Sequence, residues 1–185
     1  LVSALQKNSQ PVQKITIVPR TMGSLGYTMN MPEEERYLMT RDEILAQITT
    51  LLGGRAAEII KFGQVTTGAA NDIERATKLA RGRVTQYGMS DAFGPMGLES
   101  SGAQYLDGRN VQNCSEETST LIDDEVRKIL SECQEQAVNL LKGNDTALVK
   151  ISEYLLAKEN ITGEEFMALL KEARPPQAGE CLCLC

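Results

Sequence analysis

The pattern of apolar and polar residues divides the chain into a β-rich beginning and a helical remainder. Two short runs rich in β-branched and aromatic residues, Ile15–Val18 and Leu25–Met29, lie on either side of a turn that contains Gly23. From Thr40 onward, apolar residues recur every three or four positions, which is the period of a helix with one buried face. The pattern predicts an α+β, mainly α fold: a small N-terminal β-sheet or hairpin packed on helices, followed by a C-terminal helical bundle.

Helix-start and helix-stop signals divide the remainder of the chain into five helices. A capping box at Thr40 and Glu43 opens the first, whose apolar face crosses two glycines with at most a slight interruption before a third glycine ends it. Asp145 is expected to cap the fourth helix, and a second capping box, Thr162 with Glu165, opens the last. The predicted helices cover roughly 41–63, 71–87, 116–142, 146–158 and 163–173.

These elements predict four consecutive parts of the chain. Residues 1–90 hold the sheet and the first two helices, and residues 91–114 form a long polar, glycine-rich loop. Residues 115–173 form the C-terminal helical part, and residues 174–185 are expected to be a flexible tail. The tail ends with Cys181, Cys183 and Cys185, which are interpreted as an incidental extension, with a soft metal or a lipid as the alternative.

Composition excludes several kinds of chemistry. The formal net charge of −6 disfavours a nucleic-acid surface, because phosphate binding needs clustered Lys and Arg. The chain contains no histidine, so it cannot form a His-dependent catalytic triad or a His-bearing zinc site from its own residues. It also lacks the G-x-x-x-x-G-K-[ST] phosphate loop, so no motif here binds ATP. No apolar run approaches the ~18 residues of a membrane span.

One carboxylate, Asp72, has two possible roles. With Asn71 just before it, Asp72 stands where the second helix is expected to begin, and Asn and Asp at such a position often cap the first turn. Along the helix, however, Asp72 lines up with Ala76, Leu79 and Arg83 rather than with the charged face. A carboxylate at the head of a mostly apolar row tends to be partly buried and to need a partner. The spacing leaves both a cap and a ligand open.

Several motifs, taken in order, resemble one protein family. They are "PVQKITIVPR", "LGYTMNMPEEERYLMTRDEIL", "LLGGRAAEIIKFGQVTTGAANDIERATKLA" and "YGMS". Together they are similar to the peptidase domain of FtsH-type ATP-dependent zinc metalloproteases, and the similarity covers nearly all of residues 1–173. The resemblance implies a zinc site in which Asp72 is the third metal ligand and Asn71 either a neighbour of the ligand or a cap.

The remaining zinc ligands of this family lie on a helix with the sequence H-E-x-G-H, which also carries the Glu general base. The resemblance implies that this chain starts immediately after that helix, because "LVSALQ" resembles the residues that follow it. Zinc is therefore expected in the complete protein and not in this segment, which is expected to be inactive alone. ATP and Mg are expected in an upstream AAA module rather than here.

The resemblance also suggests a substrate-binding strand. In this family a small sheet lies beside the active site, and Leu25, Gly26, Tyr27, Thr28 and Met29 match it. An edge strand there is able to pair with an extended substrate backbone, and the alternative is that the strand belongs only to the core. Glu58 has two possible roles as well, either near the metal site or paired with Arg55.

The function implied is that of a membrane-anchored, ATP-dependent zinc metalloendopeptidase that processively degrades unfolded or misassembled proteins. The implied partners are unfolded polypeptides and further copies of the chain in a homo-hexamer, and no nucleic acid is expected. The implied location is the cytoplasmic face of the bacterial inner membrane, with the anchor outside this segment. The alternative hypothesis is a non-catalytic helical oligomerisation scaffold that lacks the metal helix.

Overall fold

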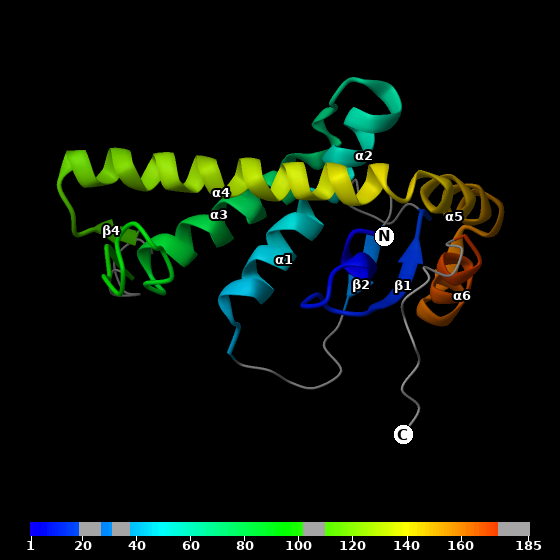
Figure 1. The fold of residues 1–185 in the computed structure, drawn as a ribbon, viewed down its shortest axis with the longest axis horizontal. Coiled ribbons are helices and arrows are strands. Elements are labelled where there is room, and N and C mark those ends of the chain that lie inside the picture. The colour runs from blue at the N-terminus through cyan, green and yellow to red at the C-terminus, as the bar shows by residue number, and fades with distance from the viewer. Residues whose placement is uncertain (19–26, 31–37, 102–109, 174–185) are drawn as a thin grey trace.

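A computed structural model describes residues 1–18, 27–30, 38–101 and 110–173 of the chain. The long helix α4 spans the molecule, with α1 and α3 packed against it and the sheet, α5 and α6 near its C-terminal end (Figure 1). The α+β, mainly α fold class is confirmed.

In chain order the elements are η1 (Ser3–Leu5), β1 (Val12–Thr16), β2 (Tyr27–Asn30), α1 (Arg41–Leu51), α2 (Gly53–Phe62), η2 (Thr67–Ala69), α3 (Ala70–Thr85), β3 (Glu99–Ser101), β4 (Asn110–Gln112), α4 (Glu116–Lys142), α5 (Asp145–Lys158), β5 (Asn160–Thr162) and α6 (Gly163–Ala173).

The predicted hairpin is confirmed, and a third strand joins it. β1 pairs antiparallel with β2 on one side and with β5 on the other, giving the order β2-β1-β5. Ile15 at the centre of the sheet lies opposite Thr28 and Ile161. The sequence did not predict β5, because a three-residue strand is too short to show a period of two. Among the described strands, β2 and β5 form the two edges of this sheet.

Two capping boxes are confirmed and one predicted cap is wrong. The Thr40 side chain accepts from the Glu43 amide, and the Glu43 carboxylate accepts from the Thr40 amide at 2.7 Å. Thr162 and Glu165 make the same exchange. Asp145, however, is the first residue of α5, and Asn144 holds the cap position without a side-chain cap bond. The Asp145 carboxylate instead forms an ion pair with Lys61 of α2.

The first predicted helix is two helices separated by one residue. Leu52 lies between α1 and α2, and the Leu52 amide still donates to the Ile48 carbonyl at 3.1 Å. A Cβ atom on Gly53 would meet a side-chain carbon of Val2 at 3.0 Å, so glycine lets the start of the chain approach α2 closely. The predicted slight interruption is therefore confirmed, and close packing at Gly53 gives a physical reason for a glycine there.

Three clusters of buried apolar side chains hold these elements together. The largest joins α1, α3 and α4, with Ile48, Ala80 and Ile122 fully buried. A second joins the sheet to α5 and α6, with Phe166 at its centre. The third joins α2 to the C-terminal end of α4 through Ala56. The helix α3, which carries the candidate metal ligand, is thus fixed on two sides by α1 and α4.

The chain turns sharply after α3. This helix ends at Thr85, two residues earlier than predicted, and Gly88 of the "YGMS" motif adopts a left-handed backbone with φ of 60°. A Cβ atom on Gly88 would lie 2.9 Å from Pro95 Cα. Both the backbone conformation and the close approach of Pro95 require glycine here.

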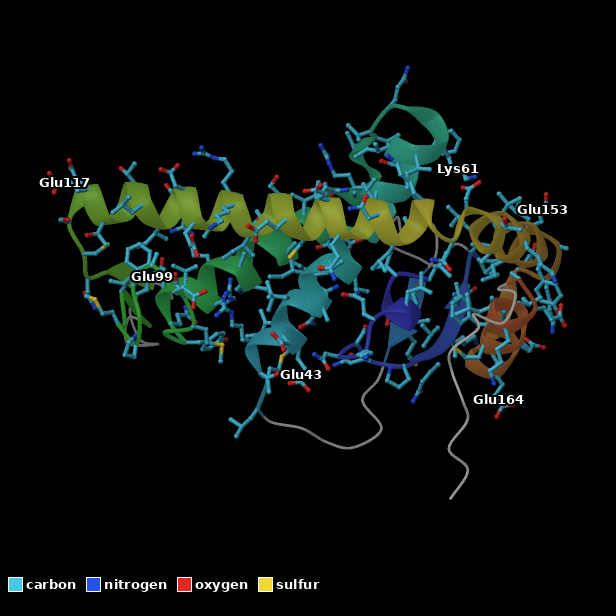
Figure 2. All side chains as sticks on the ribbon, in the orientation of Figure 1. Glu43, Lys61, Glu99, Glu117, Glu153 and Glu164 are labelled. Carbon is cyan, nitrogen blue, oxygen red and sulfur yellow. The ribbon has the colours of Figure 1, made fainter. Side chains whose placement is uncertain are left out.

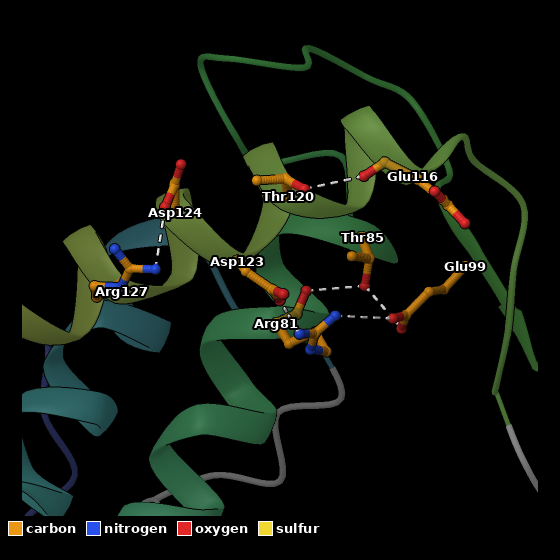
Figure 3. A network of polar contacts seen from close by, with 8 residues as sticks. All are labelled: Arg81, Thr85, Glu99, Glu116, Thr120, Asp123, Asp124 and Arg127. Atoms are coloured by element: carbon orange, nitrogen blue, oxygen red, sulfur yellow. Dashed lines mark hydrogen bonds and ion pairs between the residues drawn. The ribbon is translucent and has the colours of Figure 1, made fainter.

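The segment predicted as a loop contains two short strands, β3 and β4, which pair antiparallel. Composition did not predict them, because polar residues without a two-residue period give no strand signal. A polar network joins β3 to α3 and α4 (Figure 3): the Glu99 carboxylate, whose side chain is 4% exposed, accepts from the Thr85 hydroxyl at 3.0 Å and lies 3.6 Å from Arg81. Arg81 also pairs with Asp123 of α4.

Arg81→Ala is expected to lower the free energy of unfolding by about 1–2 kcal/mol, because it removes a cation from beside a nearly buried carboxylate. Arg127 provides the matched control, since its ion pair with Asp124 is exposed on both sides (Figure 3). Arg127→Ala is expected to change stability by less than about 0.5 kcal/mol. Urea denaturation measures the free energy of unfolding of both variants. Equal losses of stability in the two variants would contradict a stabilising role of the ion pair between Arg81 and Glu99.

Candidate metal-ligand site

Asp72 is the third residue of α3. The helix starts one residue earlier than predicted, at Ala70, and Ala69 holds the cap position with no side-chain cap bond. Of the alternatives that the spacing left open, a cap formed by Asn71 or Asp72 is therefore excluded. The reason is the preceding turn η2, which already has helical geometry and leads directly into α3, so the first turn begins before the two polar residues.

The Asp72 carboxylate is partly accessible at the start of α3. Its side chain is half-buried, on the row that continues with the fully buried Ala76. Among the described residues, none forms a hydrogen bond or ion pair with this carboxylate. The helix dipole favours a negative charge in this first turn, so the carboxylate has electrostatic support without a side-chain partner. Asn71 next to it is exposed.

The loop before α3 is held by a contact that the sequence did not predict. The Glu58 carboxylate on α2 accepts from the Thr66 amide at 3.0 Å and from the Thr66 hydroxyl at 2.5 Å. These two hydrogen bonds are the main reason why the pKa of Glu58 lies below its ordinary value, and the positive charge of Arg55 makes a smaller contribution. The sequence signal for this contact is a Thr-x-Gly turn, in which the Thr66 hydroxyl accepts from the Gly68 amide.

Within the described ranges, no group of three His, Cys, Asp or Glu side chains is placed to hold a metal ion. The absence of histidine from the sequence agrees with this. A zinc site in a protein usually has three or four side-chain ligands, so the Asp72 carboxylate would be one ligand of such a site.

The predicted substrate strand lies partly within the described structure. Tyr27, Thr28 and Met29 belong to β2, while Leu25 and Gly26 lie outside the described residues. Among the described strands β2 is an edge of the sheet, and Thr28 and Met29 are both exposed. Within the described residues β2 packs mainly on β1 and makes no extensive contact with α3. The structure therefore places this strand and Asp72 on separate elements.

Comparison with known proteins identifies the class of protein to which this fold and sequence belong. Residues 1–169 match the model of Peptidase family M41, and the chain belongs to that family. The resemblance drawn from the motifs is confirmed.

Three similar proteins carry the printed name ATP-dependent zinc metalloprotease FtsH. The relative from Clostridium perfringens is 52% identical over 170 residues, which cover 92% of this chain and 24% of that protein. The one from Lancefieldella parvula is 53% identical over 171 residues (92% and 27%), and the one from Thermotoga maritima 45% identical over 175 residues (93% and 29%). The chain thus spans about a quarter of the length of these curated relatives.

No helix among the described residues combines the length and the apolar character needed to cross a bilayer.

Proposed function

We propose that this chain is part of the peptidase domain of an ATP-dependent zinc metalloprotease and that Asp72 supplies one of the zinc ligands. The observation that carries the proposal is the Asp72 carboxylate, half-buried at the fixed start of α3 and without a partner among the described residues. Support comes from the family membership and from relatives that carry the name of a zinc metalloprotease.

The part of this chain in the chemistry is to hold one ligand in place. A carboxylate oxygen is a common zinc ligand, and bound zinc lowers the pKa of a coordinated water. The other ligands, which the resemblance assigns to the two histidines of H-E-x-G-H, belong to sequence outside residues 1–185. The same holds for the Glu base, so residues 1–185 alone are expected to be inactive.

The remaining features of the complete protein follow from the same proposal. Its substrates are unfolded polypeptides, which it degrades processively, and its assembly is a homo-hexamer. ATP and Mg are bound by a module outside this segment, and an anchor outside this segment attaches the protein to the cytoplasmic face of the bacterial inner membrane. Relatives with ATP-dependent activity in their name, about four times longer than this chain, support this division of roles.

The zinc content of the complete protein tests the proposal. The complete protein is expected to contain about one zinc per chain, and Asp72→Asn is expected to lose most of it, because one of only three protein ligands is weakened. Glu74→Gln, on the exposed face of the same turn, is the matched control and keeps its zinc. Wild-type protein without zinc would support the scaffold hypothesis and contradict the proposal.

We further propose that β2 binds substrate by backbone pairing. The support is its position at the edge of the sheet, where its outer N–H and C=O groups are able to pair with an extended peptide. Such pairing reads the shape of the backbone rather than the side chains, which suits an enzyme that degrades many unfolded proteins.

Backbone methylation of a peptide substrate tests this pairing. On a bound strand, N–H groups point alternately toward and away from the partner strand. N-methylation is therefore expected to raise the KM at every second position of the peptide and to leave the positions between nearly unchanged. Complete protein and a series of singly N-methylated peptides are required. Equal effects at all positions, or none, would contradict the pairing.

A further inference from the structure

The connection between α2 and α3 is exposed but held in a fixed conformation. It starts at Gly63, which ends α2 with a left-handed backbone, and only Ala69 in residues 63–69 is buried. Few apolar contacts hold this stretch, so its conformation depends on hydrogen bonds. A connection of this kind is able to move unless specific side chains restrain it.

Glu58 and Thr66 provide that restraint. Both oxygens of the Glu58 carboxylate accept hydrogen bonds from Thr66, one from its amide and one from its hydroxyl. Hydrogen bonds to a charged acceptor are about twice as strong as bonds between neutral groups. The Thr66 hydroxyl in turn accepts from the Gly68 amide at 3.2 Å, so one side chain joins α2 to the turn η2.

The restraint acts on Asp72 through a short, continuous piece of backbone. The Ala70 amide donates to the Thr67 carbonyl and closes the turn η2, and α3 begins at Ala70. Asp72 lies in the first turn of α3, two residues further on. Packing on α1 and α4 fixes the body of α3, and the position of η2 adds a restraint on the first turn, which carries Asp72.

The helix α2 is a firm base for this restraint. Ala56 is fully buried against Ala137 and Leu141 of α4. At the other end of α2, Lys61 (labelled in Figure 2) forms an ion pair with Asp145 of α5 at 2.5 Å. Glu58 lies between these two anchors, so the stretch of α2 that carries it is held against α4 and α5.

We propose that Glu58 and Thr66 are positioning residues that aim the Asp72 carboxylate at the metal. Neither touches the metal, and Glu58 is not a ligand in this proposal, because both of its oxygens are already engaged by Thr66. The inference rests on the proposed function, since it requires Asp72 to be a zinc ligand. Metal sites require ligands within about 0.5 Å of their productive position, and residues that orient a ligand typically contribute 10–100-fold to metal affinity.

The test measures the zinc affinity of the complete protein by competition with a chelator. Thr66→Val keeps the shape but removes the hydroxyl, and Glu58→Gln removes the charge; each is expected to weaken zinc binding roughly 10–100-fold. Thr66→Ser restores the hydroxyl and is expected to bind within about threefold of the wild type. Thr67→Val, at the next exposed threonine, is the matched control and is expected to bind zinc normally.

One further variant and one spectroscopic measurement separate this inference from general destabilisation. Arg81→Ala lowers stability at the other end of α3 and leaves Thr66 unchanged. It therefore measures how much zinc affinity is lost through destabilisation alone. The absorption spectrum of the cobalt-substituted protein is also expected to change in Thr66→Val, because the ligand geometry changes, and to stay as in the wild type in Arg81→Ala.

The outcomes are distinct. Normal zinc affinity in Thr66→Val, or equal losses in Thr66→Val and Thr66→Ser, would overturn the positioning role and leave Asp72 as a ligand. A loss in Thr66→Val no larger than in Arg81→Ala would overturn it as well. Normal zinc affinity in Asp72→Asn would instead overturn the proposed function, and the inference with it.

Discussion

Asp72→Asn in the complete protein is expected to reduce the proteolysis of an unfolded protein substrate more than about 100-fold. Loss of a residue that only orients a zinc ligand typically costs 10–100-fold, and loss of a ligand itself is expected to cost more. ATP hydrolysis and assembly are expected to stay near wild-type levels, because the Asp72 carboxylate has no hydrogen bond or ion pair with the described residues that would hold the fold. Degradation of casein and release of phosphate measure the two activities.

Glu74→Gln is the control for this substitution, because it removes a carboxylate from the same helical turn at an exposed position. It is expected to retain at least about half of the proteolytic activity, as most surface substitutions are nearly neutral. Wild-type proteolysis in Asp72→Asn would contradict the ligand assignment. Equal losses of proteolysis and ATP hydrolysis would also count against it, because they would indicate a damaged fold rather than a lost metal ligand.

Gly163→Ala is expected to lower the free energy of unfolding by about 3 kcal/mol. The first residue of α6 lies directly against β1, so that a Cβ atom at this position would be 2.1 Å from the Val12 carbonyl oxygen and 3.3 Å from Gln13 Cα. Backbone atoms cannot move aside as a flexible side chain does, so α6 or β1 has to shift. Phe166 and Ile161, which are almost fully buried in the same cluster, would lose part of their packing.

Gly54→Ala is the matched control for that substitution. Gly54 lies in α2, and a Cβ atom there would meet nothing within 4 Å. Alanine is favoured over glycine in a helix by about 0.5–1 kcal/mol, so this variant is expected to be more stable than the wild type. Urea denaturation of the two variants gives the comparison. A neutral Gly163→Ala would mean that α6 does not begin against β1 as described.

Much of the fold was predictable because its signals are local. The boxes at Thr40 and Thr162 each need only four consecutive residues, and the hairpin needs only two neighbouring runs. β5 was not predictable, because its three residues are defined by pairing with β1, far away in the sequence. The Asp145 prediction failed for the same reason, since the carboxylate is engaged by Lys61 from another helix rather than by its own backbone.

The candidate site was only partly predictable from local sequence patterns. Spacing alone left Asp72 as either a cap or a ligand, and only the start of α3 at Ala70 removes the cap. Thr66 was not recognised, because its bond to Glu58 joins two elements whose relative position follows from packing and not from local pattern. A role in metal binding was suggested only by the family resemblance, because the sequence contains no histidine.

The distance between the metal and Asp72 in a structure of the complete protein, determined with zinc bound, tests the central claim most directly. The account predicts an Asp72 carboxylate oxygen about 2.0–2.2 Å from the zinc ion, as expected for a carboxylate ligand. A zinc ion held entirely by other residues, with the Asp72 carboxylate outside its coordination sphere, would contradict it.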